Sequence, residues 1–127
     1  MWAMQRARGT WTNFDDEILV AEMRTIPQPD RGLLFFAMQR FAQGDNAGFT
    51  LKNYGDGLIM LKKKSRSGRS LFFTYDEADK VKLVLLLAYK KESDEAPESL
   101  INAARERRGR YIERRRSERR LEQRKPR

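Results

Sequence analysis

The chain of 127 residues contains no cysteine and no histidine. Without cysteine, a disulfide framework and a thiolate metal site are both excluded, and nothing indicates an oxidising compartment. Without histidine, a metal site with imidazole ligands and a pair of histidines acting as general acid and base are excluded as well. These two absences narrow the possible classes of enzyme considerably.

Long apolar segments are also missing. The longest apolar run, Leu83–Tyr89, has seven residues, whereas roughly 20 are needed to span a bilayer. The residues Met1–Arg6 lack the apolar block of a signal peptide. We therefore expect a cytoplasmic protein that has no membrane partner.

The positive charge is concentrated in one part of the chain. Of the net charge of +9, residues 105–127 carry +8, from eleven Arg and one Lys against four Glu. A neutral body with a basic arm favours contact with a polyanion, most often nucleic acid, over contact with an acidic membrane surface. The length suits one domain, so we predict a single domain over residues 1–112 and an Arg-rich basic C-terminal extension over residues 113–127.

The first half of the chain predicts a short strand followed by two helices. Residues 9–14 combine β-branched and aromatic side chains, which favour a strand. Apolar residues then recur at helical spacing over residues 14–26, and Pro27 ends that helix. Asp30 is the expected cap of a second helix, in which apolar residues recur over residues 33–41.

The second half predicts three strands and a last helix. The strands cover residues 58–63, 71–75 and 81–89, and the helix begins at Pro97 with an apolar stripe that ends at Ile112. We predict an α+β fold, in which a small antiparallel-type sheet (the three-stranded meander plus the N-terminal strand) is flanked by an N-terminal helix pair and a C-terminal helix. Because the eight residues after Ile112 include no apolar side chain, we expect a helix there to fray or to fold only against a partner.

A second cationic cluster lies at the end of the first meander strand. It has five positive charges within eight residues and no acid, from Lys62, Lys63, Lys64, Arg66 and Arg69. Strand alternation predicts Lys62 and Lys64 on one face, with Arg69 approaching from the next strand. Such charges can bind a phosphate backbone, or they can keep an edge hairpin soluble. Composition favours neither interpretation.

Acidic residues form three short clusters, 15–17, 76–79 and 92–95. A magnesium site built from carboxylates is conceivable. Each cluster, however, lies where helix caps and turns favour Asp and Glu. We therefore expect neither a metal site nor a cofactor.

The stretch Leu51–Lys62 resembles the entrance to the second strand, K-x-L-x-D-G-L-x-E-L-R, in HigB and related RelE-type toxins. An Arg-started strand over residues 69–75 follows, then an apolar strand that ends in the pair Lys90 and Lys91, and a proline-started helix over residues 97–112. The resemblance covers about half of the chain. It implies a small sheet flanked by helices, a metal-independent endoribonuclease that cuts mRNA on the ribosome and so inhibits translation, and neutralisation by a cognate helical antitoxin.

The resemblance also implies roles for particular residues. Lys62 and Lys64 would lie near the scissile phosphate, and Arg69 would stabilise the charge of the transition state. Lys91 would take the next cationic place, and Tyr89, which precedes the lysine pair, is a candidate proton donor. These groups would orient the nucleotide and neutralise charge while the ribose 2′-hydroxyl attacks the adjacent phosphate. The other basic residues that we expect to contact RNA are Lys63, Arg66, Lys90, Arg105 and Arg108.

The sequence departs from the family pattern in four places. Met60 replaces the usual acidic residue of the strand, and Lys62 replaces an arginine. The spacing from the lysine pair to Pro97 is one residue longer than the common form, and no late catalytic tyrosine is evident after Lys91. Proton donation to the leaving group is therefore the least secure step of the predicted mechanism.

Two other functions remain open from the sequence. One is a non-catalytic protein that binds RNA or the ribosome, including rRNA through the basic extension. The other is a gyrase inhibitor of the ParE type, which shares the scaffold. If the catalytic interpretation holds, Lys64→Ala and Arg69→Ala should cost far more activity than stability, because exposed charges seldom contribute more than about 0.5 kcal/mol to folding.

Overall fold

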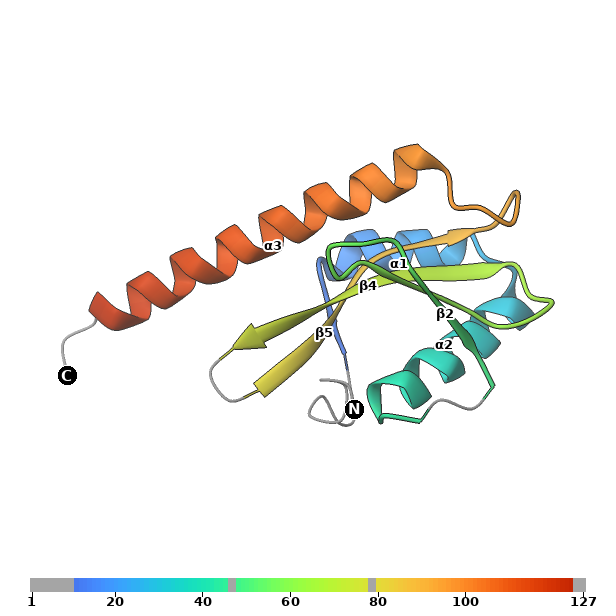
Figure 1. Ribbon diagram of the computed structural model, residues 1–127, viewed down its shortest axis with the longest axis horizontal. Coiled ribbons are helices and arrows are strands. Elements are labelled where there is room, and N and C mark those ends of the chain that lie inside the picture. The colour runs from blue at the N-terminus through green and yellow to red at the C-terminus, as the bar shows by residue number, and fades with distance from the viewer. Residues whose placement is uncertain (1–10, 46–47, 78–79, 125–127) are drawn as a thin grey trace.

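The computed structural model describes residues 11–45, 48–77 and 80–124. Over these residues the chain forms three helices and five strands, which confirms the predicted α+β class (Figure 1). In chain order the elements are β1 Thr12–Asn13, α1 Asp16–Arg24, α2 Gln28–Ala42, β2 Thr50–Asn53, β3 Ile59–Lys62, β4 Gly68–Glu77, β5 Lys80–Lys90 and α3 Glu98–Arg124. Residues 9 and 10 of the predicted opening strand, and residues 78 and 79 of the second acidic cluster, lie outside the described residues.

The five strands form one mixed sheet in the order β1-β5-β4-β3-β2. Strands β2 to β5 pair antiparallel with their neighbours, whereas β1 pairs parallel with β5. The predicted meander is confirmed as β3, β4 and β5. The sequence does not predict the edge strand β2, because its four residues include a single apolar one, Leu51, and show no clear alternation.

Polar side chains position the two N-terminal helices. The carboxylate of Asp15 accepts a hydrogen bond of 3.0 Å from the backbone N–H of Ile18, which caps α1. The prediction that Asp30 caps α2 is wrong, because the cap position is Pro27. Asp30 accepts hydrogen bonds from the backbone N–H and the hydroxyl of Ser67, at 3.0 and 2.5 Å. It thereby ties α2 to the turn between β3 and β4.

Helices α2 and α3 lie on opposite faces of the sheet (Figure 1). Phe41 of α2 packs edge to face on Phe72 of β4, with ring centroids 5.5 Å apart, and Tyr111 of α3 packs on Phe73 at 5.9 Å. Neighbouring residues of a strand point to opposite faces, so the two contacts place the two helices on opposite sides of β4. The core of the molecule therefore consists of two apolar layers, one on each face.

Side chains from two helices cover the outer edge of β5 beyond the short strand β1, which pairs with residues 84 and 85. Glu22 of α1 accepts a hydrogen bond of 3.1 Å from the backbone N–H of Ala88. Arg107 of α3 donates one of 2.8 Å to the carbonyl oxygen of Leu86, and it pairs with Glu22 at 2.8 Å. Polar groups of a strand edge that would otherwise be open are thus satisfied.

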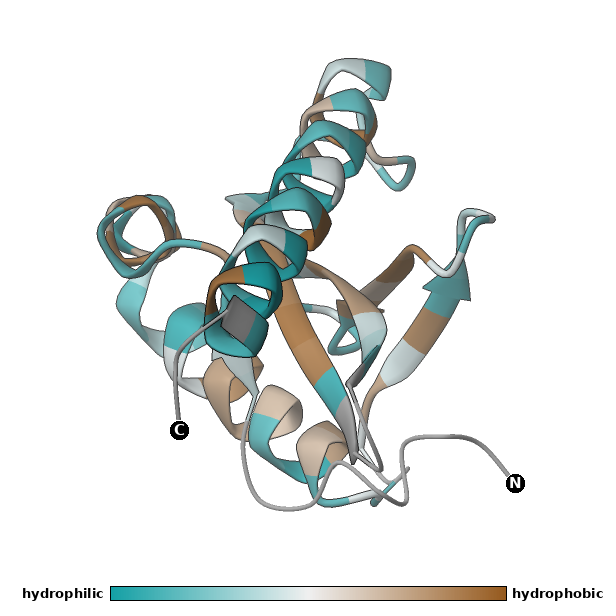
Figure 2. Ribbon diagram, turned by 90° about the vertical axis from the view of Figure 1, so that its left-hand side faces the viewer, coloured by the Kyte–Doolittle hydropathy of each residue, from teal (hydrophilic) through white to brown (hydrophobic). Residues whose placement is uncertain are grey.

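Helix α3 continues without a break to Arg124, well past the predicted apolar stripe. Arg114 donates a hydrogen bond of 2.8 Å to the carbonyl oxygen of Phe14, and Arg115 pairs with Glu118 at 3.3 Å along the helix. Contacts of this kind support a helix where apolar packing ends. Figure 2 shows that α3 is mostly hydrophilic along its length. Among the described residues, no helix is both long enough and apolar enough to cross a membrane.

Candidate functional site

The strand pairing brings three of the predicted site residues into one row. Lys62 of β3 lies opposite Arg69 of β4, and Arg69 lies opposite Tyr89 of β5. Directly paired residues project to the same face of a sheet, so these three side chains share the face that α3 covers further along. The row lies at the end of the sheet where β3 turns into β4 and where β5 ends. We call Lys62, Arg69 and Tyr89 the cationic row.

Arg69 is the most deeply buried member of the cationic row. The residue is 3% exposed, and its Nη1 donates to the carbonyl oxygens of Arg66 and Gly68 at 2.6 and 2.9 Å. Its Nε is buried and has no hydrogen-bond partner in the described part of the chain. Burial lowers the pKa of Arg69, but a guanidinium stays charged at neutral pH. The expectation that Arg69 is an exposed charge is therefore wrong.

Tyr89 is also buried, at 8% exposure, and its hydroxyl lies 3.5 Å from the sulfur of Met60. Burial, followed by the neighbouring Tyr54, raises the pKa of Tyr89 to about 12, and the charge of Arg69 opposes this shift. The phenol is thus protonated at neutral pH. It can donate a proton but is unsuited to removing one.

Two further residues of the site, Tyr54 and Asp94, were not predicted from the sequence. The hydroxyl of Tyr54 lies 4.0 Å from the Met60 sulfur, so the hydroxyls of Tyr54 and Tyr89 both approach this methionine. Lys52 lies over the Tyr54 ring, 5.1 Å from its centroid. Tyr54 follows β2 directly, and no pattern in the sequence reveals that this loop turns back over the sheet.

Asp94 is the second residue that the sequence did not single out for the site. Lys91 donates a hydrogen bond of 2.9 Å to its carboxylate. The pKa of Asp94 is lowered, first by this hydrogen bond and charge of Lys91, and to a smaller extent by the charges of Lys62 and Arg69. Lys91 therefore joins the cationic row at its rim, where one carboxylate offsets part of the positive charge.

The turn between β3 and β4 separates the other lysines from the row. Strand β3 ends at Lys62, so the strand alternation on which the expected convergence of Lys62 and Lys64 rests does not extend to Lys64. Lys64 is exposed in the turn. Lys63 donates a hydrogen bond of 2.9 Å to the carbonyl oxygen of Gly48, and Arg66 pairs with Asp30 at 3.5 Å.

The remaining predicted RNA contacts lie apart from the row. Lys90 pairs with Gly68, where an added Cβ would lie 3.1 Å from Leu34 of α2, so Lys90 leaves the sheet on the α2 side. Arg105 donates a hydrogen bond of 3.0 Å to the carbonyl oxygen of Tyr54, and Arg108 donates one to that of Asp56. These two arginines anchor α3 to the loop between β2 and β3.

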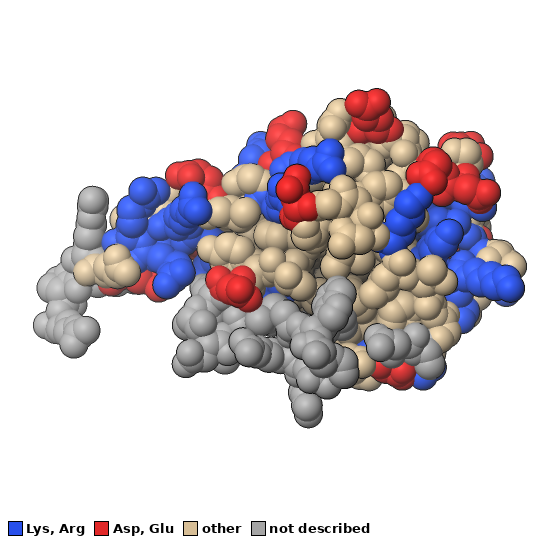
Figure 3. Space-filling model, viewed as in Figure 1, with Lys and Arg blue, Asp and Glu red and all other residues tan. Residues whose placement is uncertain are grey.

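Positive charge gathers at two ends of the molecule (Figure 3). One cluster covers the far half of α3, and the other covers the end that contains the β3–β4 turn and the end of β5. Acidic side chains lie beside the second cluster. The described residues contain no group of three or more acidic side chains that could hold a metal ion.

Comparison of the sequence with models of known protein families and with curated proteins gave no match. The resemblance to RelE-type toxins therefore stays a prediction.

Proposed function

We propose that the protein is a toxin of the RelE/HigB type, an endoribonuclease that cuts mRNA on the ribosome without a metal and so inhibits translation in the cytoplasm. The observation that carries this proposal is the cationic row, in which Lys62, Arg69 and Tyr89 share one face at the end of the sheet. Lys91 adds a fourth cationic or proton-bearing group at the rim.

In the proposed reaction, the ribose 2′-oxygen forms a bond to the adjacent phosphorus, and the bond to the 5′-oxygen of the next nucleotide breaks. The 2′-hydroxyl proton leaves to solvent or to a ribosomal group, and the leaving oxygen gains a proton. The products are a 2′,3′-cyclic phosphate and a 5′-hydroxyl. The protein's task is to orient these atoms and to neutralise the charge that develops on the phosphate.

The different exposure of the three side chains suggests a different role for each of them. Lys62 is half-buried, so its ammonium group is the one that contacts the phosphate. Arg69 is paired with Lys62 across the two strands, and it supplies positive charge from a buried position that two hydrogen bonds fix. Tyr89, whose phenol is protonated at neutral pH as that of any tyrosine is, is the proton donor of the row.

Charge on α3 supports a second contact with RNA. Arg116 and Arg119 are exposed on the far half of the helix, away from the cationic row. In the proposed function these arginines bind rRNA, while the row engages the messenger. A helical antitoxin is the proposed partner that neutralises the protein.

The burial of Arg69 and Tyr89 favours one alternative, a protein that binds RNA or the ribosome without cutting it. Both residues would then stabilise the sheet end, and Lys62, Lys64 and the α3 arginines would hold phosphates. This alternative predicts affinity for ribosomes and intact messenger.

The test is to add the purified full chain to a translation extract and to map the 5′ ends of the messenger by primer extension, with and without translating ribosomes. We expect new ends inside codons only when ribosomes translate. The new ends should carry a 5′-hydroxyl, which polynucleotide kinase labels without prior dephosphorylation. Ends with a 5′-phosphate would contradict the metal-independent reaction. Ribosome binding with intact messenger would support the non-catalytic alternative, and intact messenger with a DNA-damage response in cells would indicate a gyrase inhibitor.

A further inference from the structure

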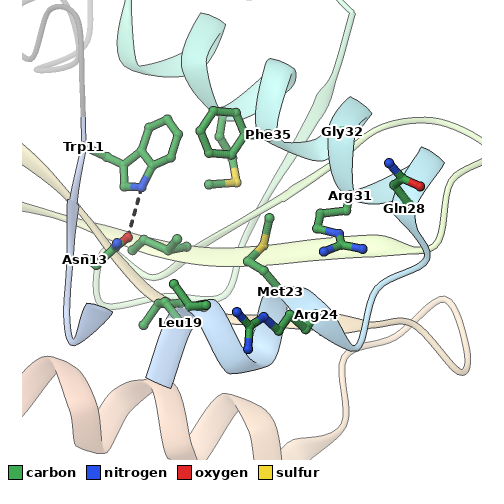
Figure 4. A pocket seen from close by; sticks show the side chains of 12 residues that line it. Trp11, Asn13, Leu19, Met23, Arg24, Gln28, Arg31, Gly32 and Phe35 are labelled. Carbon is green, nitrogen blue, oxygen red and sulfur yellow. Dashed lines mark hydrogen bonds between the residues drawn. The ribbon is translucent and has the colours of Figure 1, made fainter. Parts of the chain in front are cut away.

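A pocket unrelated to the cationic row opens between α1, α2 and the start of the sheet (Figure 4). Its volume is about 600 Å³, within the range of roughly 300 to 1,000 Å³ that small-molecule sites occupy. Its apolar lining comes from both helices, from strand β5 and from the residue just before β1, through Trp11, Leu19, Met23, Phe35, Met38 and Leu85. Trp11 and Phe35 meet edge to face, with ring centroids 5.2 Å apart.

The polar groups of the pocket carry one sign of charge. Arg24 and Arg31 line it together with Asn13 and Gln28, and no acidic side chain is found in its lining among the described residues. The Nε of Arg31 is buried and has no hydrogen-bond partner within the described residues. A buried guanidinium N–H without an acceptor beside an apolar cavity favours an anionic group as the missing acceptor.

The two kinds of lining lie toward different ends of the pocket. In Figure 4, Trp11 and Phe35 are at one end, Gln28 and Arg31 are at the other, and Arg24 lies beside Met23. A ligand that fits this arrangement has an apolar body with an anionic group at one end. A carboxylate suits the arginines, because it accepts two parallel hydrogen bonds from a guanidinium.

We propose that this pocket binds a small amphipathic carboxylate, with its apolar body against Trp11 and Phe35 and its carboxylate between Arg24 and Arg31. The site is independent of the proposed ribonuclease function, because none of its lining residues belongs to the cationic row. Binding at this pocket and cleavage of RNA can therefore succeed or fail separately.

A substitution at Gly32 adds a side chain at the lining of the pocket. Gly32 lines it, and a Cβ added at Gly32 would meet no atom within 4 Å. Gly32→Leu therefore places a side chain in or beside the cavity without a clash at its first atom, and the loss of a helical glycine favours the fold. Gly109 in α3 is equally open at its Cβ, so Gly109→Leu is the matched control away from the pocket.

The experiment measures the binding of decanoate to the full chain by isothermal titration calorimetry, with 1-decanol as the uncharged probe. We expect one decanoate per chain, bound at least about tenfold more tightly than decanol, because a charge-assisted hydrogen bond contributes roughly 1.5–3 kcal/mol. Arg24→Gln and Arg31→Gln should each weaken decanoate about tenfold. Arg40→Gln, on α2 but outside the pocket lining, should leave the affinity unchanged.

Gly32→Leu should weaken decanoate binding at a melting temperature no lower than that of the wild-type protein, and Gly109→Leu should leave the affinity as it is. The proposal is overturned if decanoate does not bind, or if decanol binds as tightly. Unchanged affinity in both Arg24→Gln and Arg31→Gln would overturn it as well, since the carboxylate would then not lie between the two arginines.

Discussion

The burial of Arg69 could not be expected from its neighbours in the sequence. It follows two exposed basic residues, Lys64 and Arg66, in the sequence. It is nevertheless only 3% exposed, and it donates hydrogen bonds to two carbonyl oxygens. Its burial follows from the pairing of β4 between β3 and β5, which places it between Lys62 and Tyr89 on one face of the sheet. Arg69→Ala would leave carbonyl groups without a donor, so this substitution tests stability together with activity, whereas Lys62→Ala tests activity more cleanly.

The raised pKa of Tyr89 predicts a loss of stability at high pH. In the unfolded chain a tyrosine ionises near its ordinary pKa of 10, whereas in the folded protein it ionises at about 12. Between these values the unfolded state loses the proton first, so stability falls as the pH rises above about 10. Tyr89→Phe removes this contribution.

Urea unfolding at pH 9 and pH 11 measures the effect. The wild-type protein should lose about 1 kcal/mol more stability between the two pH values than Tyr89→Phe does. Equal losses would show that the Tyr89 phenol titrates normally and is not buried as the structure has it.

At the scale of elements, the edge of β5 links three parts of the fold. Glu22 of α1 and Arg107 of α3 meet there, and each also bonds to the backbone of β5. This arrangement fixes the near half of α3 on the sheet. The far half then extends from this base to the end of the molecule opposite the β3–β4 turn, where it carries its own basic cluster (Figures 1 and 3).

Arg107→Ala should destabilise the protein by about 2 kcal/mol, because it leaves the carbonyl oxygen of Leu86 without this donor and removes the ion-pair partner of Glu22 in a partly buried place. Arg110→Ala is the matched control, since Arg110 is mostly exposed and, among the described residues, forms an ion pair only with Glu106 on the helix surface. It should change stability by less than about 0.5 kcal/mol. Chemical denaturation of both variants checks this. A similar cost for both would show that Arg107 does not link α3 to β5.

These elements also show what the sequence could predict. The helix pair and the meander have strong apolar periodicity, and both were predicted correctly. Strand β2 and the far half of α3 lack an apolar pattern, because one is an edge strand and the other is supported by charge pairs. The row of Lys62, Arg69 and Tyr89 lay within the predicted residues, but Tyr54 and Asp94 reach the site through loops, whose paths no periodicity encodes.

At the scale of the whole molecule, the charge is divided between two ends, which predicts a measurable salt dependence (Figure 3). Each phosphate contact to single-stranded RNA lowers the slope of log affinity against log salt by about 0.7. Removing two exposed arginines in Arg116→Gln/Arg119→Gln should therefore make the slope shallower by about 1.4.

Fluorescence anisotropy with a short single-stranded RNA over a series of salt concentrations measures this slope. The control Arg24→Gln/Arg40→Gln removes the same net charge from the N-terminal helix pair and should leave the slope unchanged. If both double variants change it equally, net charge rather than the position of α3 governs RNA binding.

The most direct test of the central claim compares two lysines that leave opposite faces of the same sheet end. Messenger 5′ ends are mapped in a translation extract with the wild-type protein, with Lys62→Ala and with Lys90→Ala. The cationic row predicts cuts inside codons for the wild-type protein and for Lys90→Ala, and a rate lower by about 100-fold or more for Lys62→Ala. Intact messenger with the wild-type protein, or equal rates for the two variants, would contradict it.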